Sequence, residues 1–402
     1  MEKWQQNYRA GRIALIINPQ AFIFSLHLQL KFFAMTGLSP NEQIPPVHIH
    51  NFNAGPSILP KEVLEQAAAA ILNFSNTGLS ILEFGHRTPE FTAVMKEARA
   101  LVKELMHLDD AHKVLFLHGG ASTQFMQVPM NLLDTKECAA YTDTGVFGAK
   151  AIKEAKLFGK VEIVCSSKDK NYSYLPKDFA VPNDAKYLHI TTNNTIYGTQ
   201  WHHIPATSNS LVADMSSDIL SRVLDFNKFD LIYAGAQKNM GAAGVNIVVV
   251  NENILGKIKR ALPTMMDYRN HIAEESMLNT PPVFAVYVCM LTLRWVKAQG
   301  GVAALEKLNR AKAALLYKEI DENDFFVGTA AKEDRSNMNV CFVMKDPTLE
   351  EAFLKHTKSF NIAAIKGHRS VGGFRASLYN ALPISSVQVL VDAMKSFAQM
   401  NK

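Results

Sequence analysis

The feature that most restricts the fold of this chain is an alternation of short apolar segments with helical segments downstream of Lys113. Seven apolar segments are expected to be strands, at 114–117, 138–142, 161–165, 187–191, 211–214, 231–234 and 245–250. Helical periodicity lies between some of them, at 122–133 and 146–158. Apolar strands interleaved with helices are typical of a mainly parallel sheet covered by helices. The sequence therefore predicts an α/β domain whose ligands bind beyond the carboxyl ends of the strands.

The segments on either side of this region have a different periodicity. Apolar spacing predicts helices at 63–74, 89–106, 305–319 and 385–399, and strands at 339–344, 362–365 and 375–379. The last five of these segments suggest a smaller α+β domain near the C-terminus. We expect a large domain over 62–304 and a small domain made of 49–61 and 305–402.

Composition excludes several classes of protein. Of the 402 residues 48% are hydrophobic and 20% are charged, which is ordinary for a globular chain with a sizeable core. The net charge of +5 comes without a Lys/Arg block, so a nucleic-acid surface is not favoured. The four cysteines show no CxxC pairing, at positions Cys138, Cys165, Cys289 and Cys341. We expect them to be reduced core thiols in a cytoplasmic protein, with no disulfide framework and no metal site.

The first 48 residues are set apart from the rest. Residues 13–30 carry no charged side chain, and Arg12 precedes them, as in a secretory signal or a membrane anchor. Pro19 and the polar His27 and Gln29 interrupt the stretch, so it is too diluted for a membrane-spanning helix. We expect residues 1–48 to be a disordered or non-native extension, with Met35 as an alternative start.

The stretch HGGASTQF, at 118–125, has the pattern of a phosphate site. A strand ends, two glycines turn the chain, and small residues open a helix. Unpaired N–H groups at a helix start carry partial positive charge, which suits a phosphate. No GKS or GKT follows, so a nucleotide P-loop is not supported. The alternative is a tight strand-to-helix turn that needs glycine for its backbone alone.

Asp214 ends one apolar strand, and Lys238 lies in the Gly-rich loop at the end of the next. A carboxylate at the end of a buried strand is costly without a cationic partner, and a protonated ring nitrogen would serve. A lysine in a semi-buried loop has a lowered pKa, so its free amine can attack an aldehyde. The alternatives are a helix N-cap for Asp214 and a surface lysine for Lys238. The small residues around Lys238 in YAGAQKNMGAAG (233–244) favour a site that a flat group can approach.

A phosphate cradle, a strand-end aspartate and a strand-end lysine form one set. Pyridoxal phosphate needs an anchor for its phosphate, a carboxylate on its pyridinium nitrogen and an amine for its aldehyde. The sequence therefore predicts pyridoxal 5′-phosphate as the cofactor.

Five stretches in matching order carry a family resemblance: NFNAGPSILP (51–60), FGHRTPEF (84–91), YAGAQKNMGAAG (233–244), MLNTPPVFA (277–285) and KGHRSVGGFRASLYNALP (366–383). With them the chain resembles the phosphoserine aminotransferase family, class V aminotransferases of the fold-type I pyridoxal-phosphate enzymes. The resemblance runs from about His50 to the C-terminus. It implies that Lys238 binds the cofactor aldehyde covalently and then moves the proton at the substrate Cα. It also implies that Asp214 pairs with the pyridinium nitrogen.

The resemblance assigns the other cofactor contacts as well. Thr195 is expected on the side of the ring hydroxyl, and Phe147 against the ring face. Ala121 and Ser122 are expected to supply N–H groups to the phosphate, and Gln237 to add a contact. Asn279 and Thr280 match positions that reach the phosphate from a neighbouring subunit, which implies a homodimer with shared active sites.

For the substrate, the resemblance places Arg87 on the α-carboxylate. It places four further residues at the phosphate end of phosphoserine: His86, His368, Arg369 and Arg375. The residue types agree with this assignment, because substrates with two anionic ends need two cationic clusters at a fixed separation. A solvated basic loop is the alternative for residues 366–375.

Two positions depart from the family pattern. Phe147 stands where many relatives have tryptophan, and it offers a smaller face for stacking. Ser122 lies in GGASTQF, where some relatives read GGGRGQF, so no guanidinium is available there.

The expected reaction is the transamination of 3-phosphohydroxypyruvate with glutamate, which gives O-phosphoserine and 2-oxoglutarate in serine biosynthesis. The phosphorylated 4-hydroxythreonine of pyridoxine biosynthesis is a second substrate that the same pocket could take. Two alternatives are a fold-type I lyase, such as a cysteine desulfurase, and a catalytically silent homologue. The first needs a reactive cysteine on a mobile loop, and the second has no reason to keep Lys238 with Asp214.

Overall fold

The computed structural model describes residues 48–402, and residues 49–402 form one compact unit. The expectations for residues 1–47, including the alternative start at Met35, lie outside the described residues. None of the helices within 48–402 is long and apolar enough to cross a membrane.

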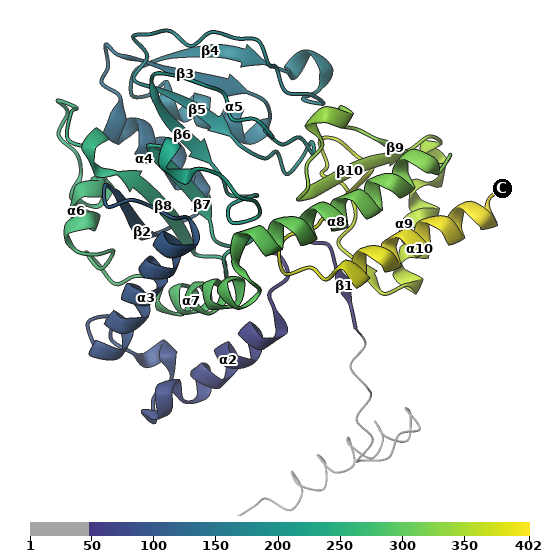
Figure 1. Cartoon of the computed structure of the whole chain (residues 1–402), viewed down its shortest axis with the longest axis horizontal. Coiled ribbons are helices and arrows are strands. Elements are labelled where there is room, and N and C mark those ends of the chain that lie inside the picture. Colours follow the sequence, from purple (N-terminus) through teal and green to yellow (C-terminus); the bar gives the residue numbers. More distant parts are fainter. Residues whose placement is uncertain (1–47) are drawn as a thin grey trace, which may run out of the picture. The chain divides into compact units, whose positions relative to one another are not determined.

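A seven-stranded sheet with the order β2-β8-β7-β6-β5-β3-β4 forms the centre of this unit (Figure 1). Its strands are β2 (His112–His118), β3 (Cys138–Asp143), β4 (Lys160–Ser166), β5 (Tyr187–Thr191), β6 (Ser210–Asp214), β7 (Leu231–Gly235) and β8 (Val245–Asn251). Only β8 runs against its neighbours, β2 and β7, and the other pairs are parallel. The predicted mainly parallel, seven-stranded sheet is confirmed.

Helices cover both faces of this sheet. One face packs on α2 (Lys61–Leu72), α3 (Pro89–Leu105) and α7 (Val283–Ala298), and the other on α4 (Ala121–Leu132), α5 (Val146–Ala155) and α6 (Tyr268–Ala273). Side chains alternate along each strand, so in β7 Ile232 faces the first group while Tyr233 faces the second. The sequence did not predict α7. Its buried residues cover most of the helix circumference, so it lacks the narrow apolar stripe by which the other helices were predicted.

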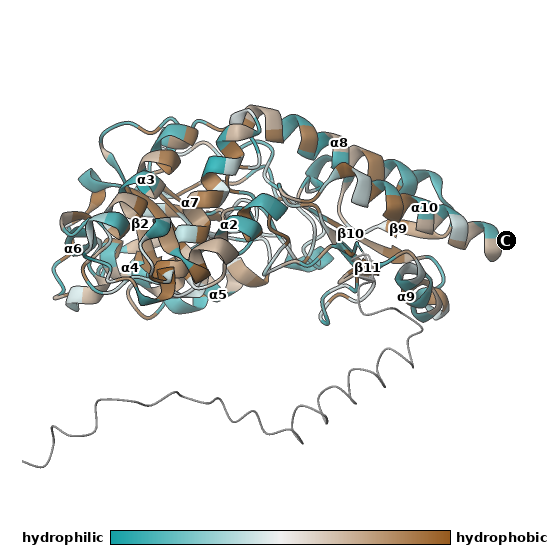
Figure 2. Cartoon of the chain, turned by 90° about the horizontal axis from the view of Figure 1, so that it is seen from below, coloured by the Kyte–Doolittle hydropathy of each residue, from teal (hydrophilic) through white to brown (hydrophobic). Residues whose placement is uncertain are grey.

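The C-terminal region builds a second core. Its elements are α8 (Gly301–Glu322), β9 (Phe326–Gly328), β10 (Asn339–Met344), α9 (Glu350–Ser359), β11 (Ile362–Ala363), β12 (Phe374–Ser377) and α10 (Ile384–Met400). β10 pairs with β9 and β12 in an antiparallel sheet, while β11 pairs with β1 (His50–Asn51) near the start of the described chain. In Figure 2, α8 and α10 carry hydrophilic and hydrophobic residues together, as helices with one packed face do.

Phe52 belongs to this second core, next to residues of α8, β10 and α10. An N-terminal segment therefore packs with the C-terminal region, as the predicted grouping of 49–61 with 305–402 requires. The division into two domains at these boundaries stays a prediction. The expected strands at 362–365 and 375–379 are shorter or shifted, since β11 ends at Ala363 and β12 covers Phe374–Ser377.

The cysteines follow the sequence prediction only in part. All four are free thiols, and Cys289 and Cys341 are buried as expected. Cys138 and Cys165 are partly exposed. Cys138 is the first residue of β3, and Cys165 lies on β4, which is an edge strand of the sheet.

Lys312, on α8, is fully buried, which is rare for a lysine. Its ammonium donates to the carbonyl oxygens of Leu378, Tyr379 and Leu382 at 2.8, 2.8 and 3.1 Å. No ion pair to Lys312 occurs among residues 48–402. Burial lowers the pKa of this lysine to about 7. The side chain ties α8 to the connection between β12 and α10.

We expect Lys312→Met to lower the free energy of unfolding by about 2–4 kcal/mol, because the carbonyl groups lose their donor inside the core. The folded protein binds the lysine proton less tightly than the unfolded chain. The free energy of unfolding of the wild type therefore increases relative to that of the variant as the pH rises from about 7 to 10.5, by up to about 1.4 kcal/mol per pH unit. Urea unfolding across this pH range measures the difference. Lys318→Met, on the exposed side of the same helix, is the control and is expected to be neutral. If this difference between the wild type and Lys312→Met became smaller as the pH rises, the proposed hydrogen bonds of Lys312 would not account for the stability.

Candidate active site

A cavity of about 290 Å³ lies at the carboxyl ends of the parallel strands. Nine of the fourteen predicted site residues line it: Ala121, Ser122, Phe147, Thr195, Asp214, Gln237, Lys238, His368 and Arg375. They come from loops or helix starts that follow β2, β3, β5, β6 and β7, and from β12 and the loop before it. The sheet therefore gathers segments that are far apart in the sequence.

Lys238 reaches into this cavity from the loop after β7. Its ammonium nitrogen donates to Thr195 Oγ1 at 2.8 Å and lies 5.6 Å from the centre of the Phe147 ring. Burial lowers the pKa of this lysine to about 8, while the nearby Asp214 carboxylate opposes the fall. More of the amine is therefore unprotonated near neutral pH than in an ordinary lysine, and the unprotonated form is the one that attacks a carbonyl.

Asp214, at the end of β6, is buried in the wall of the same cavity. Its Oδ1 accepts from the backbone N–H of Ser216 at 2.9 Å. No ion pair to Asp214 is found in the described part of the chain, and burial raises the pKa of the carboxyl. No helix follows directly, so the alternative of a helix N-cap does not hold. A buried carboxylate of this kind suits a cationic ligand.

The cradle between β2 and α4 has the geometry expected for an anion site. Gly119 has a φ of +86°, and a Cβ there would lie 2.4 Å from Thr123 Oγ1, so the turn needs glycine. No side chain caps the start of α4, which leaves the first N–H groups, including those of Ala121 and Ser122, directed at the cavity end. The uncapped helix start can receive a phosphate.

Residues 54–57, for which the sequence predicted no role, pack onto the loop that carries Lys238. Ser57 donates through its backbone N–H to the Gln237 carbonyl at 2.9 Å, and through its hydroxyl to the Lys238 carbonyl. Ala54 and Gly55 line the cavity. The only sequence signal was the motif NFNAGPSILP, which supported the resemblance but indicated no contact.

Of the predicted cationic residues, Arg375 and His368 line the cavity. The Nε of Arg375 is buried and has no hydrogen-bond partner among the described residues. Its positive charge lowers the pKa of Lys238, which places it within electrostatic reach of the amine. Burial lowers the pKa of His368, and its Nδ1 lies 2.7 Å from Ser370 Oγ.

The remaining predicted residues do not line the cavity of their own chain. Arg87 and Arg369 are exposed, and His86 is half-buried. Asn279 and Thr280 are also exposed, and both contact His118 at the end of β2. They border the cradle through His118, which directly precedes Gly119.

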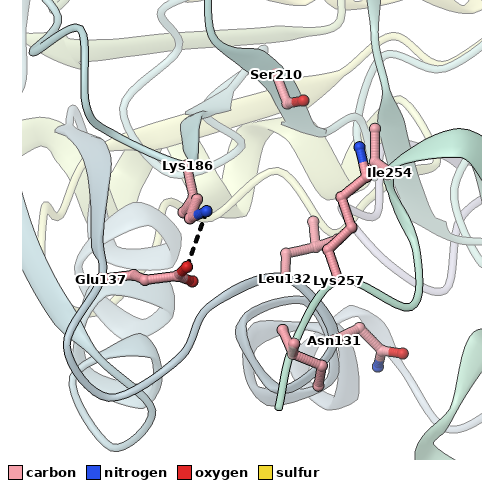
Figure 3. A pocket seen from close by; sticks show the side chains of 8 residues that line it. Asn131, Leu132, Glu137, Lys186, Ser210, Ile254 and Lys257 are labelled. Carbon is pink, nitrogen blue, oxygen red and sulfur yellow. Dashed lines mark ion pairs between the residues drawn. The ribbon is translucent and has the colours of Figure 1, made fainter.

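A second cavity lies at the opposite, amino-terminal edge of the sheet, where β3, β5 and β6 begin (Figure 3). Figure 3 shows Lys186 directed at Glu137, with 2.8 Å between the charged groups. No predicted site residue lines it. Of its two lysines, Lys186 is paired with Glu137 and Lys257 is exposed. Because no predicted site residue lies there, we place the chemistry at the carboxyl edge.

Comparison with known proteins gives a consistent result. The family described as aminotransferase class V matches residues 49–390. A phosphoserine aminotransferase of Flavobacterium johnsoniae is 60% identical over 348 residues, covering 86% of this chain and 98% of the relative. The structure of phosphoserine aminotransferase from Bacillus circulans subsp. alkalophilus superimposes with a TM-score of 0.86 at 43% identity, covering 88% of this chain and 99% of that one. A PLP-bound phosphoserine aminotransferase from Trichomonas vaginalis has a TM-score of 0.82 at 36% identity, covering 87% of this chain and all of that one.

Proposed function

Since this chain belongs to the class-V aminotransferase family, we propose that it transfers the amino group of glutamate to 3-phosphohydroxypyruvate, giving O-phosphoserine and 2-oxoglutarate. The cofactor is pyridoxal 5′-phosphate. One observation carries the proposal for this chain. A lysine with a lowered pKa and a buried, unpaired aspartate line the same cavity, beside an uncapped helix start.

The residues of the cavity fit the cofactor part by part. Asp214 would hold the protonated ring nitrogen, the start of α4 with Gln237 would hold the phosphate, and Phe147 would pack on the ring. Thr195 lies next to the Lys238 amine, which would hold the aldehyde. When bound, pyridoxal phosphate supplies an electron sink for the bond broken at the substrate Cα.

Lys238 is proposed as the acid–base group of the reaction. Its unprotonated amine accepts the proton from the substrate Cα, and its ammonium form returns a proton on the other side of the transfer. The hydrogen bond to Thr195 directs the nitrogen within the cavity.

Arg375 is better placed than Arg87 for the α-carboxylate. The α-carboxylate is bonded to the carbon on which Lys238 acts, and Arg375 is the arginine that shares the cavity with Lys238. Arg87 is exposed and outside the cavity lining. We therefore assign Arg375 to the α-carboxylate. We assign Arg87 to the phosphate end with the other three predicted residues, His86, His368 and Arg369.

A homodimer is proposed because the predicted phosphate contacts Asn279 and Thr280 face outward. An exposed apolar strip on α2 and the turns after it supports this assembly, and its residues are Leu64, Ile71, Leu72, Leu79 and Leu82. Leu72 is 82% exposed. A group of exposed apolar side chains such as this one is unusual on a monomer and typical of an interaction surface. A second copy of this chain is the partner that we propose for the strip.

We expect the double variant Leu72→Asp/Leu82→Asp to be monomeric and at least tenfold less active, because two buried charges destabilise an apolar interface. Light scattering after size-exclusion chromatography measures the mass. Leu157→Asp, at an equally exposed leucine outside the strip, is the control and is expected to leave mass and activity unchanged. A dimer that survives the double change would place the interface elsewhere.

The lyase alternative is not favoured, since no cysteine lines the cavity. Burial raises the pKa of Cys165 to about 12, the opposite of what a reactive thiolate needs. We also propose the cytoplasm as the location, in keeping with four free thiols.

The test of the function uses the purified holoenzyme. Phosphoserine and 2-oxoglutarate are expected to give glutamate, and phosphoserine alone is expected to change the visible absorbance of the cofactor. An unaltered spectrum together with no glutamate would refute the proposal. Phosphorylated 4-hydroxythreonine, assayed in parallel, decides whether the pyridoxine precursor is a second substrate.

A further inference from the structure

Tyr379 is a buried side chain close to the cavity that the mechanism above does not use. It lies just after β12 and is 1% exposed. Its hydroxyl donates to the carbonyl oxygen of Ala54 at 2.9 Å, and Asn339 Nδ2 donates to it at 3.3 Å. Ala54 lines the cavity, so this hydroxyl is bonded to a part of the cavity wall.

The same hydroxyl is linked to the catalytic lysine through one residue. Burial raises the pKa of Tyr379 to about 12, and hydrogen bonds from Asn339 and Thr195 oppose the rise. Thr195 Oγ1 in turn accepts from the Lys238 amine. When the threonine O–H points at Tyr379, its lone pairs are left for the N–H of Lys238. The order of groups is therefore Lys238, Thr195, Tyr379 and Asn339.

Asn339 continues the chain of hydrogen bonds into the wall near Asp214. Its Oδ1 accepts from Asn193 Nδ2 at 2.8 Å, and Asn193 also donates to Ser217 Oγ at 2.8 Å. Asn193 and Ser217 line the cavity, and every member of the chain beyond Lys238 is buried. A satisfied buried network of this kind fixes one arrangement, because each alternative leaves a polar group unpaired.

The network also sets the position of Arg375. Asn339 donates through Nδ2 to Ser377 Oγ at 3.1 Å, and Ser377 and Arg375 lie two residues apart on the same face of β12. Tyr379 follows on the same segment. The C-terminal region, with its substrate arginine, is thereby held in register with the Lys238 side of the cavity.

We propose that Tyr379 is a positioning residue for the reaction: its hydroxyl orients Thr195, and so Lys238, while holding the Ala54 wall of the cavity. The expected change in kcat rests on the proposed function. The expected change in the visible absorbance of the cofactor requires only that the cofactor is bound.

The test compares Tyr379→Phe with Tyr317→Phe in the holoenzyme. Tyr317 is a matched control, because its hydroxyl donates to one backbone carbonyl, that of Ser336, and it does not line the cavity. For Tyr379→Phe we expect a kcat about tenfold lower, the equivalent of one buried hydrogen bond, with cofactor affinity changed less than about twofold. Tyr317→Phe is expected to leave kcat within about twofold of the wild type.

The pH dependence of the cofactor's visible band gives a readout that a merely structural role would not move. Without Tyr379, the Thr195 O–H is free to donate to the lysine nitrogen, which favours the unprotonated nitrogen. The transition is therefore expected at lower pH in Tyr379→Phe and unchanged in Tyr317→Phe. If Tyr379→Phe does not fold, Thr195→Val removes the hydroxyl between Tyr379 and Lys238, and the transition is again expected at lower pH because the lysine nitrogen loses its acceptor. An unchanged transition in Thr195→Val would then overturn the proposal.

A folded Tyr379→Phe with the kcat and the pH transition of the wild type would overturn the proposal. So would an equal loss in both tyrosine variants. If the wild type binds cofactor but does not convert phosphoserine, the proposed function fails, while the pH transition still tests the positioning role.

Discussion

Lys238→Ala is expected to lose about 10⁴-fold in turnover, the upper end of the range for removal of a positioned acid–base group. The variant lacks the amine that holds the cofactor aldehyde and moves the proton at the substrate Cα. Single-turnover mixing with phosphoserine, followed by the visible absorbance, measures the loss. Cofactor is expected to stay bound, because Asp214, the α4 start and Gln237 are unchanged.

Lys150→Ala is the matched control. The Lys150 amine lies 5.6 Å from the Phe147 ring, as that of Lys238 does, but Lys150 is exposed and does not line the cavity. We expect it to retain the activity of the wild type. Full activity in Lys238→Ala would remove the lysine from the mechanism.

The pKa of Lys238 near 8 also fixes the direction of the pH dependence. The amine accepts a proton only in its neutral form, so the single-turnover rate is expected to rise with pH and level off above about 8. A rate that falls over this range would contradict the assignment of the base.

Arg375→Ala is expected to lower kcat/KM by roughly 30-fold to several thousand-fold, equal to about 2–5 kcal/mol for a desolvated charge pair that loses one partner. Arg375→Lys is expected to recover only part of the loss, because an ammonium cannot form the paired hydrogen bonds of a guanidinium. Cofactor affinity is expected to change little. Steady-state kinetics with phosphoserine and with glutamate measure the effect.

Comparison with Arg87→Ala separates the two ends of the substrate. The α-carboxylate is common to phosphoserine and glutamate, so Arg375→Ala should affect the two substrates equally. The other end is a phosphate dianion in one and a carboxylate in the other, so Arg87→Ala should affect phosphoserine more. Arg310→Ala, at an exposed arginine of α8, is the control and should be neutral. The opposite pattern would exchange the two assignments.

Much of the fold could be predicted because its signals are local. Each strand of the large sheet is a short apolar run, and a side-chain period of two or 3.6 can be read within about ten residues. Asp214 and Lys238 could be singled out for the same reason, since Asp214 ends one such run and Lys238 lies in the loop after the next. α7 was not predicted because most of its residues are apolar and buried, so few polar positions along it mark a helical period.

The sequence by itself thus determined the parallel sheet, the strand ends and the residue types needed for the cofactor. Only the tertiary structure decided which polar groups meet in the cavity. Tyr379 donates to Ala54 across 325 residues, and Arg375 lies within electrostatic reach of Lys238 while Arg87 does not line the cavity. Contacts of this kind depend on how the two cores pack together. Such contacts cannot be predicted from local periodicity, because the residues involved lie far apart in the sequence and their sequence neighbours give no sign of the contact.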